Sequence, residues 1–139
     1  KKSIKDVRDR FKFLFYAPII TVSALSKKRV PKILDLIMSV YENYSRRIPT
    51  SKLNKLLKEA VLKHPIPSDK GKLVKIYFAT QFDICPPRIA LVMNRPHVLH
   101  FSYKRYIMNQ LRENVELDGA PLVLIPRKRS ELDPEDKED

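Results

Sequence analysis

Two groups of cationic side chains carry the chemistry that this sequence suggests most directly. Lys52 and Lys55 lie on the polar side of one predicted helix, and Lys104, Arg105 and Arg112 lie on the polar side of another. Both groups are free to face phosphates, because Lys and Arg on an outward helix face can bind phosphate oxygens. The cation run at 127–129 is either a phosphate contact or the solvated end of a strand. The remaining candidate phosphate contacts are Arg95, Arg127, Lys128 and Arg129.

Other reactive side chains give weaker indications. His97 and His100 are three residues apart with no acidic or cysteine partner nearby, so a solvated or packing role is favoured over a metal site. Cys85 is the single cysteine, which excludes an internal disulfide and fits a reducing cytoplasm. No paired carboxylates and no nucleophile with its base are recognisable. The sequence as it stands therefore predicts no enzyme.

Two amphipathic helices are predicted to position the cations. Apolar residues recur at intervals of three and four in 53–61 and again in 103–115. Thr50 or Ser51 can cap the first helix and Ser102 the second, because a hydroxyl oxygen accepts hydrogen bonds from free backbone amides. A histidine-proline pair ends the first helix, and a glycine-alanine-proline run marks the turn beyond the second.

Three segments predict strands. Residues 73–82 alternate between apolar and polar, 88–93 lie between proline-containing turns, and 122–125 form a short apolar run. The apolar stripes of the two helices need a common surface, so we expect a three-stranded sheet with both helices on one face. The residues expected in this core are Leu53, Leu57, Ile107 and Leu111. Three tyrosines could stack on bases, but their spacing favours packing in the core: Tyr77, Tyr103 and Tyr106.

Charge is distributed unevenly along the chain. The formal net charge is +12, yet the last ten residues contain six acids and one lysine and carry −5, so residues 1–129 account for +17. Such a field attracts polyanions and predicts binding that weakens with salt, although a solubilising surface is the alternative. No apolar run approaches the roughly 20 residues of a membrane-spanning helix.

The first 48 residues have a different character. Segment 19–22 predicts a short apolar strand, and 30–44 predicts a long helix that starts near Pro31. A helix-strand-helix of this kind cannot close a core by itself, so it indicates the last unit of an α/β domain whose earlier strands are missing. The chain begins at Lys1 without a methionine, which also suggests a fragment. One face of the first predicted helix consists of Ile4, Val7, Phe11 and Leu14.

Eight runs of residues together resemble the C-terminal part of the Der or EngA family of bacterial GTPases. They cover essentially the whole chain except its acidic tail, which makes the resemblance far more specific than any single motif. The runs are APIITVSAL (17–25), VYENYSRRI (40–48), TSKLNK (50–55), ATQ (79–81), PP (86–87), VMNRP (92–96), SYKRY (102–106) and NQLRE (109–113).

The family has two tandem GTPase domains followed by a KH-like domain, and it acts in assembly of the large ribosomal subunit. The resemblance implies an α/β (α+β) chain in which 1–48 end the second GTPase domain, 49–129 form the KH-like domain and 130–139 are an acidic disordered tail. It implies GTP or GDP with Mg²⁺ in the parent protein and no cofactor in this fragment. The implied partners are the large ribosomal subunit with its rRNA and the GTPase domains of the same chain. The implied location is cytoplasmic and ribosome-associated, without a membrane.

The resemblance also assigns a role to Ser23, Ala24 and Leu25. They follow the predicted strand 19–22, where the family places the loop whose backbone amide faces the guanine oxygen. Residues 26–29 (SKKR) stand where the family usually has glycines. Glycine adopts positive φ at little cost, so this sequence departs from the family at that point.

Two absences limit what the fragment can do. Gly71 and Gly119 are the only glycines, so no Gly-x-x-x-x-Gly-Lys-Ser/Thr phosphate loop is present. The sequence also contains no Asn-Lys-x-Asp motif. We therefore expect no GTP hydrolysis by the fragment. Ordinary KH domains clamp nucleic acid with a Gly-x-x-Gly loop, whereas the corresponding turn here is 99–102. Phosphate contacts would then come from side chains and helix N-termini, for which 102–105 are the best candidates.

Two functional hypotheses follow from the sequence. In the first, the KH-like domain docks on ribosomal RNA while the attached GTPase domains control its presentation. In the second, the domain packs against a GTPase domain of the same chain and relays nucleotide state without binding RNA directly. The charge of the body favours the first hypothesis, and the missing Gly-x-x-Gly loop favours the second.

Overall fold

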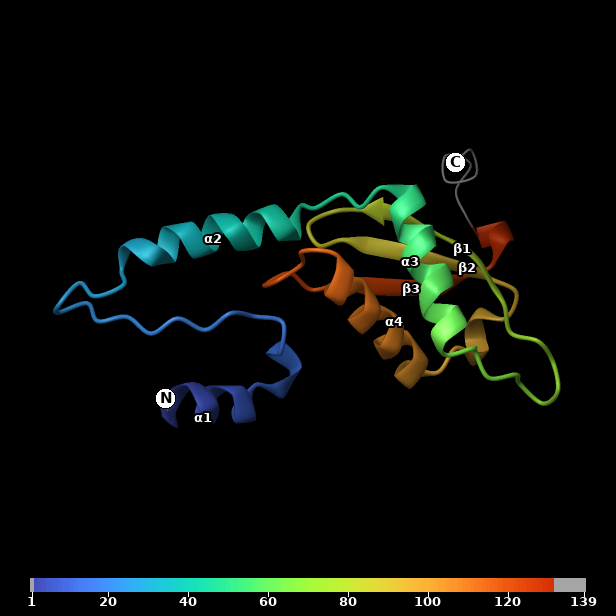
Figure 1. Ribbon diagram of the computed structural model, residues 1–139, viewed down its shortest axis with the longest axis horizontal. Helices are drawn as coiled ribbons and strands as arrows, with labels where there is room; N and C mark the ends of the chain where they lie inside the picture. Colours follow the sequence, from blue (N-terminus) through green and yellow to red (C-terminus); the bar gives the residue numbers. More distant parts are fainter. Residues whose placement is uncertain (1, 132–139) are drawn as a thin grey trace.

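A three-stranded mixed sheet forms the centre of the part of the molecule that follows residue 50 (Figure 1). The computed structural model describes residues 2–131. Strand β1 (Ile76–Asp83) pairs antiparallel with β2 (Arg88–Met93), and β2 pairs parallel with β3 (Val123–Arg127), in the order β1-β2-β3. A parallel pair needs a crossover connection, which here contains the helix α4.

Helices α3 (Thr50–Lys63) and α4 (Phe101–Asn114) cover one face of this sheet (Figure 1). Their apolar stripes meet the sheet, and the expected core residues are all at most 5% exposed. The short 3-10 helix η2 (Pro96–Val98) lies between β2 and α4. The predicted sheet with two helices on one face is confirmed. The four residues that test it are Leu53, Leu57, Ile107 and Leu111.

Two strand boundaries differ from the predicted ones. Strand β1 begins at Ile76 and not at residue 73, because the side chain of Asn94 engages the preceding segment: its Nδ2 donates to the Leu73 carbonyl at 2.8 Å and its Oδ1 accepts from the Lys75 amide at 2.9 Å. Strand β3 continues to Arg127 through Pro126. A proline is tolerated there because β3 is an edge strand and the missing N–H removes no ladder bond.

The predicted helix caps are wrong. Helix α3 begins at Thr50 after the cap residue Pro49, and α4 begins at Phe101 after His100, and neither cap residue makes a side-chain hydrogen bond. Thr50 and Ser102 therefore lie inside the first turns. Backbone bonds start each helix instead, since the Leu53 and Lys104 amides donate to Pro49 and His100 carbonyls.

The N-terminal part consists of helix α1 (Lys2–Arg10), the 3-10 helix η1 (Lys12–Leu14) and the long helix α2 (Pro31–Tyr44), which starts where the sequence predicts. Between η1 and α2 the chain runs alongside α2 in an extended form and then turns back into the start of that helix (Figure 1). The predicted strand at 19–22 is wrong. A strand needs a neighbour, and among the described residues of this segment only the isolated bridge between Ser23 and Lys28 forms.

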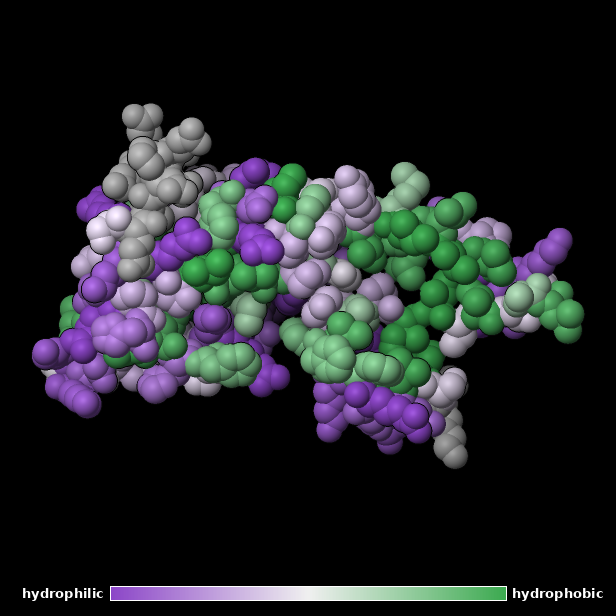
Figure 2. All heavy atoms as spheres, turned by 180° about the vertical axis from the view of Figure 1, so that it is seen from behind, coloured by the Kyte–Doolittle hydropathy of each residue, from purple (hydrophilic) through white to green (hydrophobic). Residues whose placement is uncertain are grey.

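This N-terminal part leaves much apolar surface exposed. Figure 2 shows hydrophobic residues gathered over α2 and the chain beside it. A groove of about 240 Å³ lies between α1 and segment 17–19, and a second groove runs between 18–20 and α2. Exposed apolar side chains on α2 are Leu34, Ile37, Met38 and Tyr41. An exposed apolar patch of this extent is typical of a surface that another element covers.

The turn after α4 joins the two parts of the molecule. The Gly119 amide donates to the Tyr16 carbonyl at 2.8 Å, and buried Asn43 on α2 donates from Nδ2 to the Asp118 carbonyl at 2.9 Å. A Cβ on Gly119, whose φ is +83°, would overlap Val40 of α2. We call residues 117–120 the junction turn.

The predicted acidic tail lies mostly outside the described residues. Its first two residues, 130 and 131, belong to the 3-10 helix η3 (Arg129–Glu131), and 132–139 are not described. Within residues 2–131, no helix is both long and apolar enough to span a membrane.

Candidate nucleic-acid interface

Helix α3 presents a row of lysines to solvent. Leu53, Leu56 and Leu57 turn toward the sheet and are buried, while Lys52 and Lys55 on the opposite side are exposed, as expected. The 3.6-residue helical period separates the two faces. This face can therefore meet a polyanion without disturbing the core.

Helix α4 presents only part of its predicted cationic group. Arg105 is exposed and Lys104 is half-exposed in the first two turns. Arg112 is different: its guanidinium donates to the carbonyls of Leu117 at 3.2 Å and Ala120 at 2.7 Å. The expectation that Arg112 is free to face phosphates is wrong, because the chain beyond the helix folds back onto it.

Arg112 instead holds the junction turn against the end of α4. Its guanidinium lies over the rings of Tyr16 and Phe15, at 5.0 Å and 5.6 Å from their centroids. Burial lowers the pKa of Arg112, while the nearby Tyr16 and Asp118 act in the opposite direction. An arginine stays protonated under any ordinary condition, so these contacts hold a fixed positive charge inside the junction.

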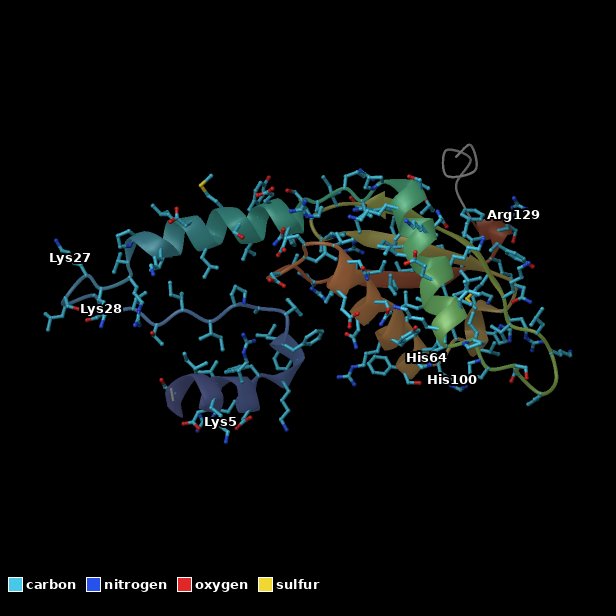
Figure 3. All side chains as sticks on the ribbon, in the orientation of Figure 1. Lys5, Lys27, Lys28, His64, His100 and Arg129 are labelled. Carbon is cyan, nitrogen blue, oxygen red and sulfur yellow. The ribbon has the colours of Figure 1, made fainter. Side chains whose placement is uncertain are left out.

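The remaining predicted cations are spread over separate places. Arg95 forms an ion pair with Asp69, with 2.9 Å between Nη2 and Oδ2. Arg127 is half-buried and lies over the Phe82 ring at 4.7 Å, whereas Lys128 and Arg129 are exposed. Figure 3 shows Arg129 beyond the end of β3, apart from His64 and His100 at the ends of α3 and α4. The structure therefore keeps Arg129 apart from the start of α4.

The tyrosines of α4 connect the two helices. Tyr103 donates its hydroxyl to the His64 carbonyl and Tyr106 donates to the Ala60 carbonyl, both at 2.7 Å. Tyr103 is buried and Tyr106 is half-buried, so core packing is the right interpretation for this pair. Tyr77 does not follow that expectation. It is 52% exposed, with the Lys75 ammonium 5.8 Å from its ring centroid, and so is accessible for stacking.

Sequence reasoning missed two cations in the loop between α3 and β1. Lys70 and Lys72 flank Gly71 and are exposed at the end of a tight turn. The available signal was the succession Asp69, Lys70, Gly71, since Asp followed closely by Gly is typical of a turn. Helical periodicity could not find these lysines, because the turn places them outside both helices.

The predicted guanine loop folds back on itself. The Ser23 amide donates to the Lys28 carbonyl at 3.2 Å, and the Ser26 amide donates to Ser23 Oγ at 3.3 Å. Lys27 and Arg29 have φ of 55° and 63°, so non-glycine residues hold positive φ in this glycine-free loop. Ala24 and Leu25 are exposed at its end. Backbone groups in an exposed loop of this kind remain accessible to a ligand.

The described residues offer no metal centre. Among residues 2–131, no cluster of three or more His, Cys, Asp or Glu side chains is arranged to hold an ion. His64 stacks edge-on against Tyr106 with 5.0 Å between ring centroids, and Cys85 is exposed.

Taken together, these elements define a small α+β domain of the KH-like type, with exposed cations on the outer faces of its helices and no Gly-x-x-Gly turn. A family model for the KH-domain-like C-terminal region of EngA bacterial GTPase enzymes matches residues 47–127. The chain belongs to this family, and the resemblance seen in the sequence is confirmed.

Full-length relatives carry the name GTPase Der. The protein from Campylobacter curvus is 61% identical over 130 residues, which are 94% of this chain and 28% of that protein. The protein from a Nitratiruptor species is 60% identical over 139 residues, which are 100% of this chain and 30% of the relative. The protein from Campylobacter fetus subsp. fetus is 56% identical over 137 residues, which are 99% of this chain and 30% of that protein. The chain therefore spans less than a third of the length of these relatives.

Proposed function

We propose that this chain is the C-terminal part of a GTP-hydrolysing protein that assembles the large ribosomal subunit, and that its KH-like domain binds ribosomal RNA. In this proposal residues 1–48 complete the second GTPase domain and 49–129 form the RNA-binding domain. The names of the relatives support the GTPase part. The protein would act in the cytoplasm, bound to ribosomal particles.

The observation that carries the RNA-binding proposal is that α3 and α4 are amphipathic. Each helix buries its apolar side on the sheet and presents exposed cations outward, Lys52 and Lys55 on α3 and Arg105 on α4. Phosphate contacts of this kind position a nucleic acid without reading its bases. They suit a domain that lacks the Gly-x-x-Gly clamp of ordinary KH domains.

The exposed apolar surface supports the GTPase-domain assignment of residues 1–48. Grooves flank segment 17–20, one toward α1 and one toward α2, and α2 exposes Leu34 and Ile37. The earlier strands of the GTPase domain would cover these surfaces. Its nucleotide would be GTP or GDP with Mg²⁺, with Ser23, Ala24 and Leu25 presenting backbone amides to the guanine. The phosphate-binding residues would belong to the preceding part of the protein.

Alanine substitutions at Lys104 and Arg105 test the RNA-binding proposal. If both residues touch phosphates, K104A/R105A weakens binding to ribosomal RNA about equally for all sequences and lowers the slope of log affinity against log salt by about one unit per lost contact. The measurement is a salt series with a transcript of large-subunit rRNA. K5A/K12A removes the same charge from the N-terminal part and serves as the matched control.

The two outcomes separate a defined site from diffuse attraction. Equal weakening by K104A/R105A and K5A/K12A would show that total charge alone drives binding, and it would overturn the site assignment. Binding that does not respond to salt would overturn the electrostatic mechanism.

A second candidate function is intramolecular relay, and the contacts of Arg112 favour it. This arginine holds the junction turn and packs on Tyr16 and Phe15, so it links α4 of the KH-like domain to the segment before the guanine loop. We propose that nucleotide state in the parent protein alters this junction. Hydrogen exchange of the Gly119 amide, compared between GDP and a non-hydrolysable GTP analogue in the parent protein, tests the relay. Identical exchange in both states would contradict it.

A further inference from the structure

The loop between α3 and β1 ends in a tight turn that stands away from the rest of the domain (Figure 1). Asp69 and Lys72 exchange two backbone hydrogen bonds, from the Asp69 amide at 2.9 Å and from the Lys72 amide at 2.8 Å. The central residues Lys70 and Gly71 both have positive φ, at 48° and 77°. Two consecutive positive-φ residues between a paired Asp and Lys are typical of a type I′ turn.

The base of this turn is pinned to the end of β2. Asp69 forms its ion pair with Arg95, and both side chains are largely shielded, at 28% and 24% exposed. The neighbouring Asn94 holds the next residues of the loop through Leu73 and Lys75. The loop is therefore anchored at two successive residues of the segment that follows β2.

The end of the turn concentrates uncompensated charge. Lys70 and Lys72 are exposed, and neither forms an ion pair with another residue in the described range 2–131. Figure 2 shows hydrophilic residues at this end of the molecule, opposite the apolar surface of α2. Lys70 also occupies a positive-φ position that glycine or asparagine fills at lower cost.

We infer that the 69–72 turn is a second phosphate-binding element of this domain, in which Lys70 and Lys72 contact the RNA backbone. The inference rests on the proposed RNA binding and adds a contact outside the helix faces. Fixing the turn before binding reduces the conformational entropy that is lost when the lysines meet phosphates. The contacts would be independent of base sequence, because an ammonium on a phosphate reads charge and position only.

The first test removes the two charges. K70A/K72A is expected to lower the affinity for a transcript of large-subunit rRNA several-fold and to reduce the salt slope by about two units. K27A/K28A removes the same charge from another exposed turn, at the far end of the molecule (Figure 3), and is expected to have a much smaller effect. Equal losses for the two double variants would overturn the inference.

The second test releases the turn and leaves its lysines in place. D69N removes the ion pair with Arg95 and raises the net charge by one. Simple attraction between the chain and RNA therefore predicts tighter binding by D69N, whereas a pinned turn predicts binding that is several-fold weaker. A circular-dichroism melt of D69N checks that the fold is retained. Tighter binding by a folded D69N would overturn the pinned turn.

Measuring rRNA binding by the unaltered chain distinguishes failure of this inference from failure of the proposed function. If it binds rRNA and K104A/R105A weakens that binding while K70A/K72A does not, the turn is excluded and the RNA-binding proposal stands. If the unaltered chain does not bind rRNA at any salt concentration, the proposed function fails and this inference fails with it.

Discussion

Tyr103 shows how one buried hydroxyl contributes to the fold. Its ring lies against Tyr106 at 5.5 Å between centroids, and its hydroxyl reaches the last turn of α3 at the His64 carbonyl. Burial raises the pKa of Tyr103 to about 12, and the nearby Tyr106 acts in the same direction. The neutral phenol is thus the form that the folded state favours, because burial penalises the charged phenolate.

This pKa predicts a loss of stability in alkaline solution. The folded pKa of about 12 exceeds the ordinary value of 10.0, so the contribution of Tyr103 is fully present below pH 10 and is lost as the pH rises through 12. Urea unfolding across this range should show a steeper fall in free energy for the unaltered protein than for Y103F. Y77F, which changes an exposed tyrosine, should behave like the unaltered protein. The same pH dependence in Y103F and the unaltered protein would contradict the prediction.

Residues were harder to predict where a segment outside their own helix folds over them. Arg112 lies on the polar side of α4, and helical periodicity alone places it in solvent. The junction turn comes from beyond the helix and brings the Leu117 and Ala120 carbonyls to it, a contact that periodicity cannot reveal. Lys52 and Lys55 were predicted correctly as exposed because nothing outside their own helix folds over them.

At the scale of secondary-structure elements, prediction was accurate where prolines mark the end or the start of an element. Strand β2 has the bounds that its flanking prolines predict, and α2 starts at the predicted Pro31. Apart from the helix caps, errors arose where the determining partner is distant in sequence. Strand β1 starts late because Asn94 binds the preceding segment. Residues 19–22 form no strand because, among the described residues, no strand pairs with them.

Asn54 on α3 closes part of the outer edge of β1. Its Oδ1 accepts from the Ala79 amide at 2.8 Å and its Nδ2 donates to the Ala79 carbonyl at 2.9 Å, so the side-chain amide replaces a neighbouring strand. Because Ala79 is buried, a loss of these bonds would leave its backbone groups unpaired.

Removal of this amide should therefore destabilise the domain. N54A is expected to lower the free energy of unfolding by roughly 2 kcal/mol, the usual range for buried groups left without partners. N114A is the control, because within the described part of the chain the Asn114 amide donates only to the Gln110 carbonyl of its own helix and is exposed. It should change stability by less than about 0.5 kcal/mol. Urea denaturation measures both, and equal losses would contradict the role of Asn54.

At the scale of the whole molecule, the junction turn determines how the two parts fit together. It bonds to Tyr16 on one side and to Asn43 of α2 on the other. Gly119 lets the turn approach α2 closely: an added Cβ would overlap Val40 Cγ2 and come within 3.0 Å of Cγ1 and 3.1 Å of Cβ. Rotation of this valine away from the added Cβ is costly, because a β-branched side chain in a helix has one strongly preferred rotamer.

The two glycines of the chain provide a matched test of this junction. G71A and G119A both place a side chain at positive φ, but Gly71 has nothing within 4 Å. We expect G71A to cost roughly 1 kcal/mol of stability and G119A to cost more, because the overlap with Val40 adds to the same strain. V40A should recover part of the loss in the double variant V40A/G119A. Thermal unfolding measures each variant, and equal effects of the two glycine substitutions would contradict the close approach.

The edges of the sheet have a consequence for how this chain would behave at high concentration. Asn54 occupies the backbone groups of Ala79 on one edge, and Pro126 deprives the other edge of an amide donor. A fibre grows by adding strands to an open sheet edge, so both edges resist that route. The apolar side chains on α2 have no such protection. Self-association of the isolated chain should therefore proceed through helix faces and give reversible oligomers that do not bind amyloid dyes.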